Sequence, residues 1–90
     1  MAQIIVSPEE LESTGTQFNS KSQELQAMTQ QANSLVQSTL AGWKGQRANK
    51  FQGDWEGMKK NLEAAVQTLQ QTSELLKRAA ADFRSADTAG

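Results

Sequence analysis

The sequence predicts an all-α protein: an antiparallel two-helix hairpin that pairs with a second copy into a four-helix bundle dimer. Apolar residues recur in steps of three, four and seven along two long segments, which is the spacing of one helix face. A short segment with two glycines separates these segments near the middle of the chain. We therefore expect a single domain over 1–90, with helices over 8–41 and 47–86, a turn over 42–46 and a frayed tail over 87–90.

The first helix has a well-defined start in the stretch VSPEEL. Ser7 suits the N-cap, Pro8 suits the first helical position, and Glu10 completes a capping box. Val6 and Leu11 have the spacing of a hydrophobic staple around that cap. These signals agree on a helix that begins at residue 8.

The apolar stripe of the first helix is thin at its beginning, where Thr14, Gly15 and Ser22 lie between the large residues. The stripe consists of Leu11, Phe18, Leu25, Met28, Ala32, Leu35, Val36 and Leu40. We expect Gly42 to follow the last turn and end the helix, since glycine is favoured at that position.

The second helix carries an almost unbroken heptad seam. Its first series is Ala48, Trp55, Leu62, Leu69, Leu76 and Phe83, and its second is Phe51, Met58, Ala65, Thr72, Ala79 and Ala86. Opposite charges four residues apart line the outside: Lys50 with Asp54, Glu56 with Lys60, Lys59 with Glu63, and Glu74 with Arg78. We interpret these charges as a solvated face.

A second helical surface is expected to cover the hairpin, because one seam leaves much of each helix exposed. Residues 25–43 carry no charge, and Val66, Leu75 and Ala80 widen the stripe beside the seam. Gly53 and Gly57 lie on the outer face, where close approach of another backbone would explain them; tolerated glycines are the alternative. The residues expected to pack in the seam or the dimer are Leu11, Phe18, Leu25, Met28, Leu35, Phe51, Trp55, Met58, Leu62, Val66, Leu69 and Leu76.

The composition argues against several functional classes. Histidine and cysteine are absent, which removes the commonest general base and the usual zinc ligands, so we predict no enzyme, cofactor or metal site. The formal net charge of -1 argues against nucleic-acid binding. No apolar run approaches the length of a membrane span, and no leader is recognisable, so we expect a cytoplasmic chain unless it leaves by a leaderless route.

The turn combines an aromatic residue with positive charge. Trp43 stands between Gly42 and Gly45, and Lys44 belongs to a basic cluster with Arg47 and Lys50. That cluster suits the C-terminal dipole of the first helix, and an anionic docking site is the alternative.

These features together resemble the WXG family, the small Esx-type substrates of type VII secretion. The signature is Trp43-Lys44-Gly45, followed by Ala48, Phe51 and Trp55 at the family's spacing. The resemblance implies a non-catalytic protein that is secreted without a cleavable signal, as a folded dimer, by an FtsK/SpoIIIE-type ATPase. It leaves open a heterodimer with a paralogous WXG protein. A cytosolic coiled-coil adaptor is the alternative function.

The family's C-terminal signal, Tyr-x-x-x-Asp/Glu, is matched by Phe83 and Asp87, with the phenolic hydroxyl missing. Phe83 equally fits the end of the seam. In the family, the turn motif of one subunit and the tail motif of its partner form one composite signal. Positions 43 and 83 lie about 60 Å apart along one helix, so only two hairpins packed antiparallel bring them together. Trp43 then either faces the partner or motor, or closes the hairpin end on Leu40, Ala48 and Phe51.

Overall fold

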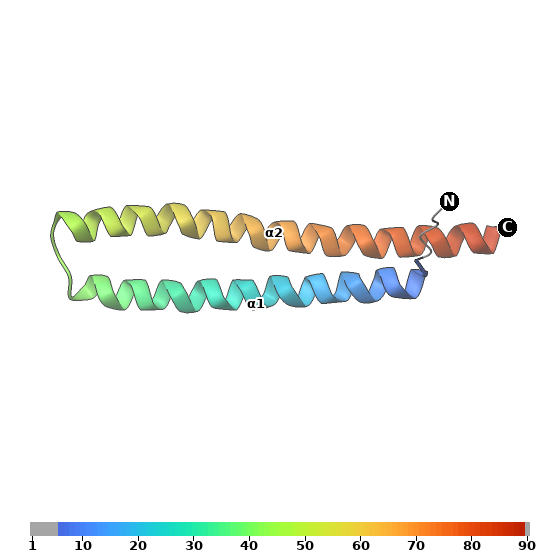
Figure 1. The fold of residues 1–90 in the computed structure, drawn as a ribbon, viewed down its shortest axis with the longest axis horizontal. Helices are drawn as coiled ribbons and strands as arrows, with labels where there is room; N and C mark the ends of the chain where they lie inside the picture. The colour runs from blue at the N-terminus through green and yellow to red at the C-terminus, as the bar shows by residue number, and fades with distance from the viewer. Residues whose placement is uncertain (1–5, 90) are drawn as a thin grey trace, which may run out of the picture.

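The chain folds into two long antiparallel helices, as the sequence predicts. The computed structural model describes the backbone of residues 6–89 and the side chains of residues 6–86. Helix α1 spans Pro8–Ala41 and helix α2 spans Gln46–Ala89, with no strand in the described part of the chain (Figure 1). Helix α2 begins one residue earlier than expected and is helical to Ala89, so fraying of 87–90 stays a prediction.

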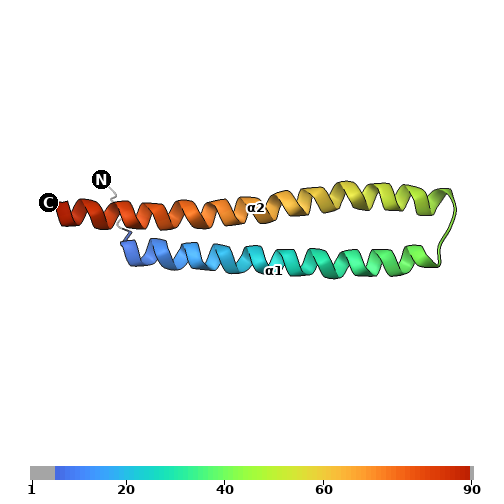
Figure 2. The same cartoon turned by 180° about the vertical axis from the view of Figure 1, so that it is seen from behind.

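The two helices form a thin rod with extents of 68 × 25 × 18 Å. Views from the front and from behind show them side by side, with the turn at one end and the start of α1 at the other (Figures 1 and 2). Helix α2 continues beyond the start of α1 (Figure 1). A rod one helix pair wide can bury only one stripe of each helix within the chain.

The N-terminal cap of α1 confirms the interpretation of the stretch VSPEEL. The backbone N–H of Glu10 donates to Ser7 Oγ at 3.1 Å, and Pro8 occupies the first turn. The N–H of Leu11 donates to the carbonyl of Ser7 at 3.1 Å. The serine therefore satisfies a donor that the first turn of a helix leaves unpaired.

The buried residues of α1 recur in steps of seven, and those of α2 do so in two groups that are separated by eleven residues, from Trp55 to Val66. On α1 the buried residues are Gly15, Ser22, Thr29 and Val36. On α2 they are Ala48, Trp55, Val66, Ser73 and Ala80. The half near the turn thus contains the larger side chains, and the half near the chain ends contains mainly small ones.

One of the two predicted heptad series of α2 is placed correctly. Its first series contributes the buried Ala48 and Trp55 and the half-buried Leu62, Leu69 and Leu76. The second series is half-buried at Ala65, Thr72 and Ala79, but Phe51 and Met58 are exposed. Val66 and Ala80, which the sequence pattern puts beside the seam, are buried instead of Phe51 and Met58. In α2, apolar residues lie on both sides of the first series: Phe51 and Met58 on one side, and Val66 and Ala80 on the other. Which of these two sets is buried depends on how α1 packs against α2.

Gly15 explains why α1 selects this register near the chain ends. A Cβ at Gly15 would lie 3.0 Å from the carbonyl oxygen of Ser73 and 3.2 Å from Lys77 Cγ. A side chain at this position would therefore force its neighbours on α2 to shift by a few tenths of an ångström. The buried hydroxyls further along α1 are satisfied within the helix, since Ser22 donates to Asn19 O at 2.7 Å and Thr29 to Leu25 O at 2.8 Å.

The charged residues make mostly local pairs. Lys50 and Asp54 pair at 2.9 Å as predicted, but Glu56 pairs with Lys59 at 3.8 Å instead of with Lys60. The predicted pairs of Lys59 with Glu63 and of Glu74 with Arg78 are not among the ion pairs of the described residues. Exposed local pairs of this kind stabilise a helix by only about 0.3–0.5 kcal/mol.

Candidate functional site: the turn, the tail and the apolar side

The glycine of the Trp-x-Gly motif is required by the backbone of the turn. Gly45 has φ of 122°, in the left-handed region that a side chain strains. Its carbonyl accepts the N–H of Asn49 at 3.0 Å, so Gly45 also occupies the N-cap position directly before α2. Gly42 follows α1 as expected, but with φ of -109° it is not the left-handed residue. The conformation that needs glycine therefore lies in the motif and not at the end of α1.

Trp43 packs within the turn and remains partly exposed. Its ring lies 5.7 Å from that of Phe51 between centroids, tilted by 40°. Trp43, Leu40 and Ala48 also line one shallow depression at this end of the rod. Trp43 nevertheless keeps 38% of its surface exposed. Both expected roles are thus compatible with the structure, because Trp43 closes the hairpin end and still offers a face to a partner.

The tail motif lies on α2 at the opposite end of the rod. Phe83 is 48% exposed, so it does not complete the hairpin core as the last member of its series. Asp87 falls within α2, but its side chain lies outside the described residues. Residues four apart lie on the same side of a helix, so positions 83 and 87 present one surface. With a rod of 68 Å between the two ends, one chain does not bring Trp43 and Phe83 together (Figure 1).

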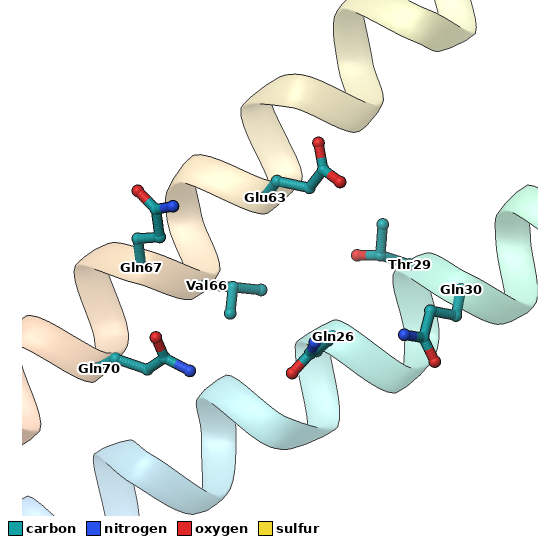
Figure 3. A pocket seen from close by; sticks show the side chains of 7 residues that line it. All are labelled: Gln26, Thr29, Gln30, Glu63, Val66, Gln67 and Gln70. Atoms are coloured by element: carbon teal, nitrogen blue, oxygen red, sulfur yellow. The ribbon is translucent and has the colours of Figure 1, made fainter.

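One long side of the hairpin is polar. Arg84 Nη1 pairs across the helices with Glu12 Oε2 at 2.7 Å. The indole Nε1 of Trp55 donates to Asn33 Oδ1 at 3.0 Å. Between these contacts lies a hollow of about 270 Å³, lined by residues of both helices: Gln26, Thr29, Gln30, Glu63, Val66, Gln67 and Gln70 (Figure 3). We call this the polar side.

The opposite side carries exposed apolar residues from both helices. Met28 and Leu35 lie two residues after Gln26 and Asn33, and two residues turn a helix by about 200°. They therefore point away from the polar side, and their side chains are 63% and 71% exposed. On α2 the same argument places the series of Phe51, Met58 and Ala65 opposite Glu63. We call the surface of Met28, Leu35, Phe51 and Met58 the apolar side.

The residues expected to pack in the seam or the dimer thus divide between two surfaces. Within the hairpin interface lie the buried or half-buried Leu11, Phe18, Leu25, Trp55, Leu62, Val66, Leu69 and Leu76. On the apolar side lie the exposed Met28, Leu35, Phe51 and Met58. Around Gly53 and Gly57 nothing within the chain comes within 4 Å of an added Cβ, so the expected approach of another backbone there stays a prediction.

Neither side carries a metal cluster or a membrane span in the part that the structure describes. No group of three or more histidine, cysteine, aspartate or glutamate side chains gathers there. No described helix is both long and apolar enough to cross a bilayer.

Sequence reasoning missed the contacts that depend on the alignment of the two helices. Asn33 is one of these, and the pair of Glu12 with Arg84 is another. A signal for the close approach was present, since Gly15, Ser22 and Thr29 recur every seven residues in phase with Val36. That series identifies the buried stripe of α1 once small residues are counted as core positions.

Comparisons with known proteins agree with this geometry. The model of the WXG100 family, described as proteins of 100 residues with WXG, matches residues 3–88. No curated protein matches the chain. Among solved structures, the secreted protein EsxB of Bacillus anthracis str. Sterne is 31% identical, with a TM-score of 0.84, over 97% of this chain and 99% of that one.

EsxA of Geobacillus thermodenitrificans shares the fold at 18% identity, with a TM-score of 0.85, over 97% of this chain and 95% of that one. The helical hairpin, the glycine that its turn requires and the family match over nearly the whole length lead to one conclusion. The chain belongs to the WXG100 family.

Proposed function

We propose that the protein is a non-catalytic substrate of a type VII secretion system, exported as a folded dimer. The observation that carries the proposal is the placement of two partly exposed aromatic residues, Trp43 and Phe83, at opposite ends of a thin rod. The family match and the secreted EsxB relative support the route. In this proposal the chain starts in the cytoplasm and leaves it without cleavage of a leader.

A second copy is the partner that the apolar side fits. Met28, Leu35 and Met58 each keep more than half of their surface exposed, and several large apolar residues exposed on one side of a protein favour an interaction site there. Two-fold symmetry is the commonest way for identical chains to cover such a surface. In an antiparallel pair the turn of each hairpin lies beside the tail of the other. Trp43 of one copy then neighbours Phe83 of its partner.

The composite end of that dimer is the surface we assign to an FtsK/SpoIIIE-type secretion ATPase. An exposed ring and an acid on one helix face give the motor an apolar contact and a charge to bind. The missing hydroxyl of Phe83 is tolerated if the motor packs against the ring. On this account Phe83→Tyr is exported at least as well as the natural chain.

Export from cells tests the proposal. Deletion of residues 83–90, Phe83→Ala and Trp43→Ala should each reduce the protein in the medium at least about tenfold, while circular dichroism shows unchanged helix content. Gln71→Ala, on an exposed position of α2, is the matched control and should be exported normally. If the deletion variant reaches the medium undiminished, the proposed function is wrong and the cytosolic adaptor is favoured. If the purified chain stays monomeric until a paralogous WXG protein is added, the dimer is a heterodimer.

A further inference from the structure

The pair of Glu12 with Arg84 differs from the other ion pairs of the described residues. Of the four pairs, three join residues three or four apart on one helix. Glu12 and Arg84 instead join α1 to α2, at 2.7 Å between Oε2 and Nη1. Arg84 also directly follows Phe83, so this link between the helices lies inside the tail motif.

The position of the pair gives it a specific role. Helix α1 begins at Pro8, which places Glu12 in its second turn, and α2 runs on past that start (Figure 1). Arg84 therefore lies where α2 loses its neighbour. The last residues of α2 belong to the part that continues beyond the start of α1 (Figure 1).

Beyond Ala80 the hairpin interface offers little else to fix the rotation of α2, because the described side chains of residues 81–86 are all exposed. Before that point the interface contains the small buried residues Gly15, Ser73 and Ala80, together with the half-buried Leu11 and Leu76. These packed side chains end short of Arg84. A short charge-assisted bond is directional and sets which side of α2 faces α1.

We propose that Glu12 is a positioning residue for the tail motif. By holding Arg84, it fixes the rotation of the last supported turn of α2 and so the direction in which the Phe83 ring is presented. Recognition of the tail then depends on the start of α1 as well as on the tail itself. The proposal rests on the proposed function for its consequence in export, but the structural part stands independently of it.

Hydrogen exchange of the purified protein tests the structural part. Glu12→Gln removes the charge and keeps the shape of the side chain. We expect amide exchange over residues 80–89 to rise about twofold to fivefold, as loss of an exposed pair allows, with no change over 50–70. Glu24→Gln is the matched control, since it removes an equal charge from a local pair with Lys21 at 3.3 Å. Equal exchange in all three proteins would overturn the proposal.

Export tests the consequence. Glu12→Gln should lower the amount of the protein in the medium. The double variant Glu12→Arg with Arg84→Glu swaps the two charges, and it should restore both export and slow amide hydrogen exchange. If Phe83→Ala blocks export but Glu12→Gln does not, the positioning role is wrong while the proposed function stands. If Phe83→Ala is exported normally, the proposed function fails, and the exchange experiment still decides whether Glu12 orders the tail.

Discussion

The polar and apolar sides of the hairpin are built from the same two helices and differ in almost every property. The polar side carries several glutamines that line the hollow. It also carries two contacts within the chain, the ion pair of Glu12 with Arg84 and the hydrogen bond of Trp55 to Asn33. The apolar side exposes 71% of Leu35 and 57% of Met58 without a partner in the chain. Polar side chains form hydrogen bonds with water, so exposing the polar side costs little free energy. The apolar side, in contrast, lowers the free energy when another surface covers it and removes it from water.

The difference arises from a rotation of about 200° between residues two apart. Each helix carries a buried stripe, a polar flank and an apolar flank, and the seven-residue repeat keeps all three in line along the rod. Gln26 and Met28, or Asn33 and Leu35, are neighbours in sequence on opposite sides of the molecule. The hairpin therefore has one long apolar side that stays exposed within the chain, and this is the side that we propose a second copy covers.

The largest expected effect comes from placing charge on the apolar side. Leu35→Glu with Met58→Glu would bury unpaired carboxylates in the proposed dimer, which costs several kcal/mol. We expect the dissociation constant to rise at least about 100-fold, so that sedimentation at micromolar concentration shows a folded monomer.

The same change of charge on the polar side provides the matched control. Gln30→Glu with Gln67→Glu adds two carboxylates to residues that line the hollow. These carboxylates stay in water, so the dimer should be unaffected. If the polar-side variant dissociates and the apolar-side variant does not, our assignment of the two sides is reversed.

A smaller effect is expected from the hydrogen bond on the polar side. Asn33→Ala leaves the indole N–H of the buried Trp55 without its acceptor. The free energy of unfolding should fall by about 1–3 kcal/mol, measured by urea denaturation at fixed protein concentration. Asn61→Ala, on an exposed position of α2, should change it by less than about 0.5 kcal/mol. Equal losses in the two variants would show that the bond contributes nothing specific to the polar side.

Local signals in the sequence predicted most of the fold. The Ser7 cap, the bounds of α1 and the turn follow from rules that act over a few residues, and the structure agrees with them. The burial of the second series of α2 is predicted wrongly at Phe51 and Met58. The sequence alone does not separate the two sides, because Met58 and Val66 are equally suitable core residues. The choice between them depends on the small residues of α1 that lie opposite.

The candidate site was predictable only where a motif is contiguous. Trp43-Lys44-Gly45 lies within one turn, so its place at the end of the rod followed from the helices on either side. The link from Glu12 to Arg84 spans almost the whole chain, and its existence depends on how far the two helices are staggered. The spacing of residues within one helix does not encode that stagger, because it depends on contacts between the two helices such as the close approach at Gly15.

The distance between the two turns of a dimer tests the central claim most directly. The chain has no cysteine, so Lys44→Cys accepts a single spin label in the turn of each copy. In the proposed antiparallel dimer, electron–electron double resonance should show a separation of about 60 Å, the length of helix between turn and tail. A separation of about 20 Å, as for two turns side by side at one end of a bundle, would contradict the account.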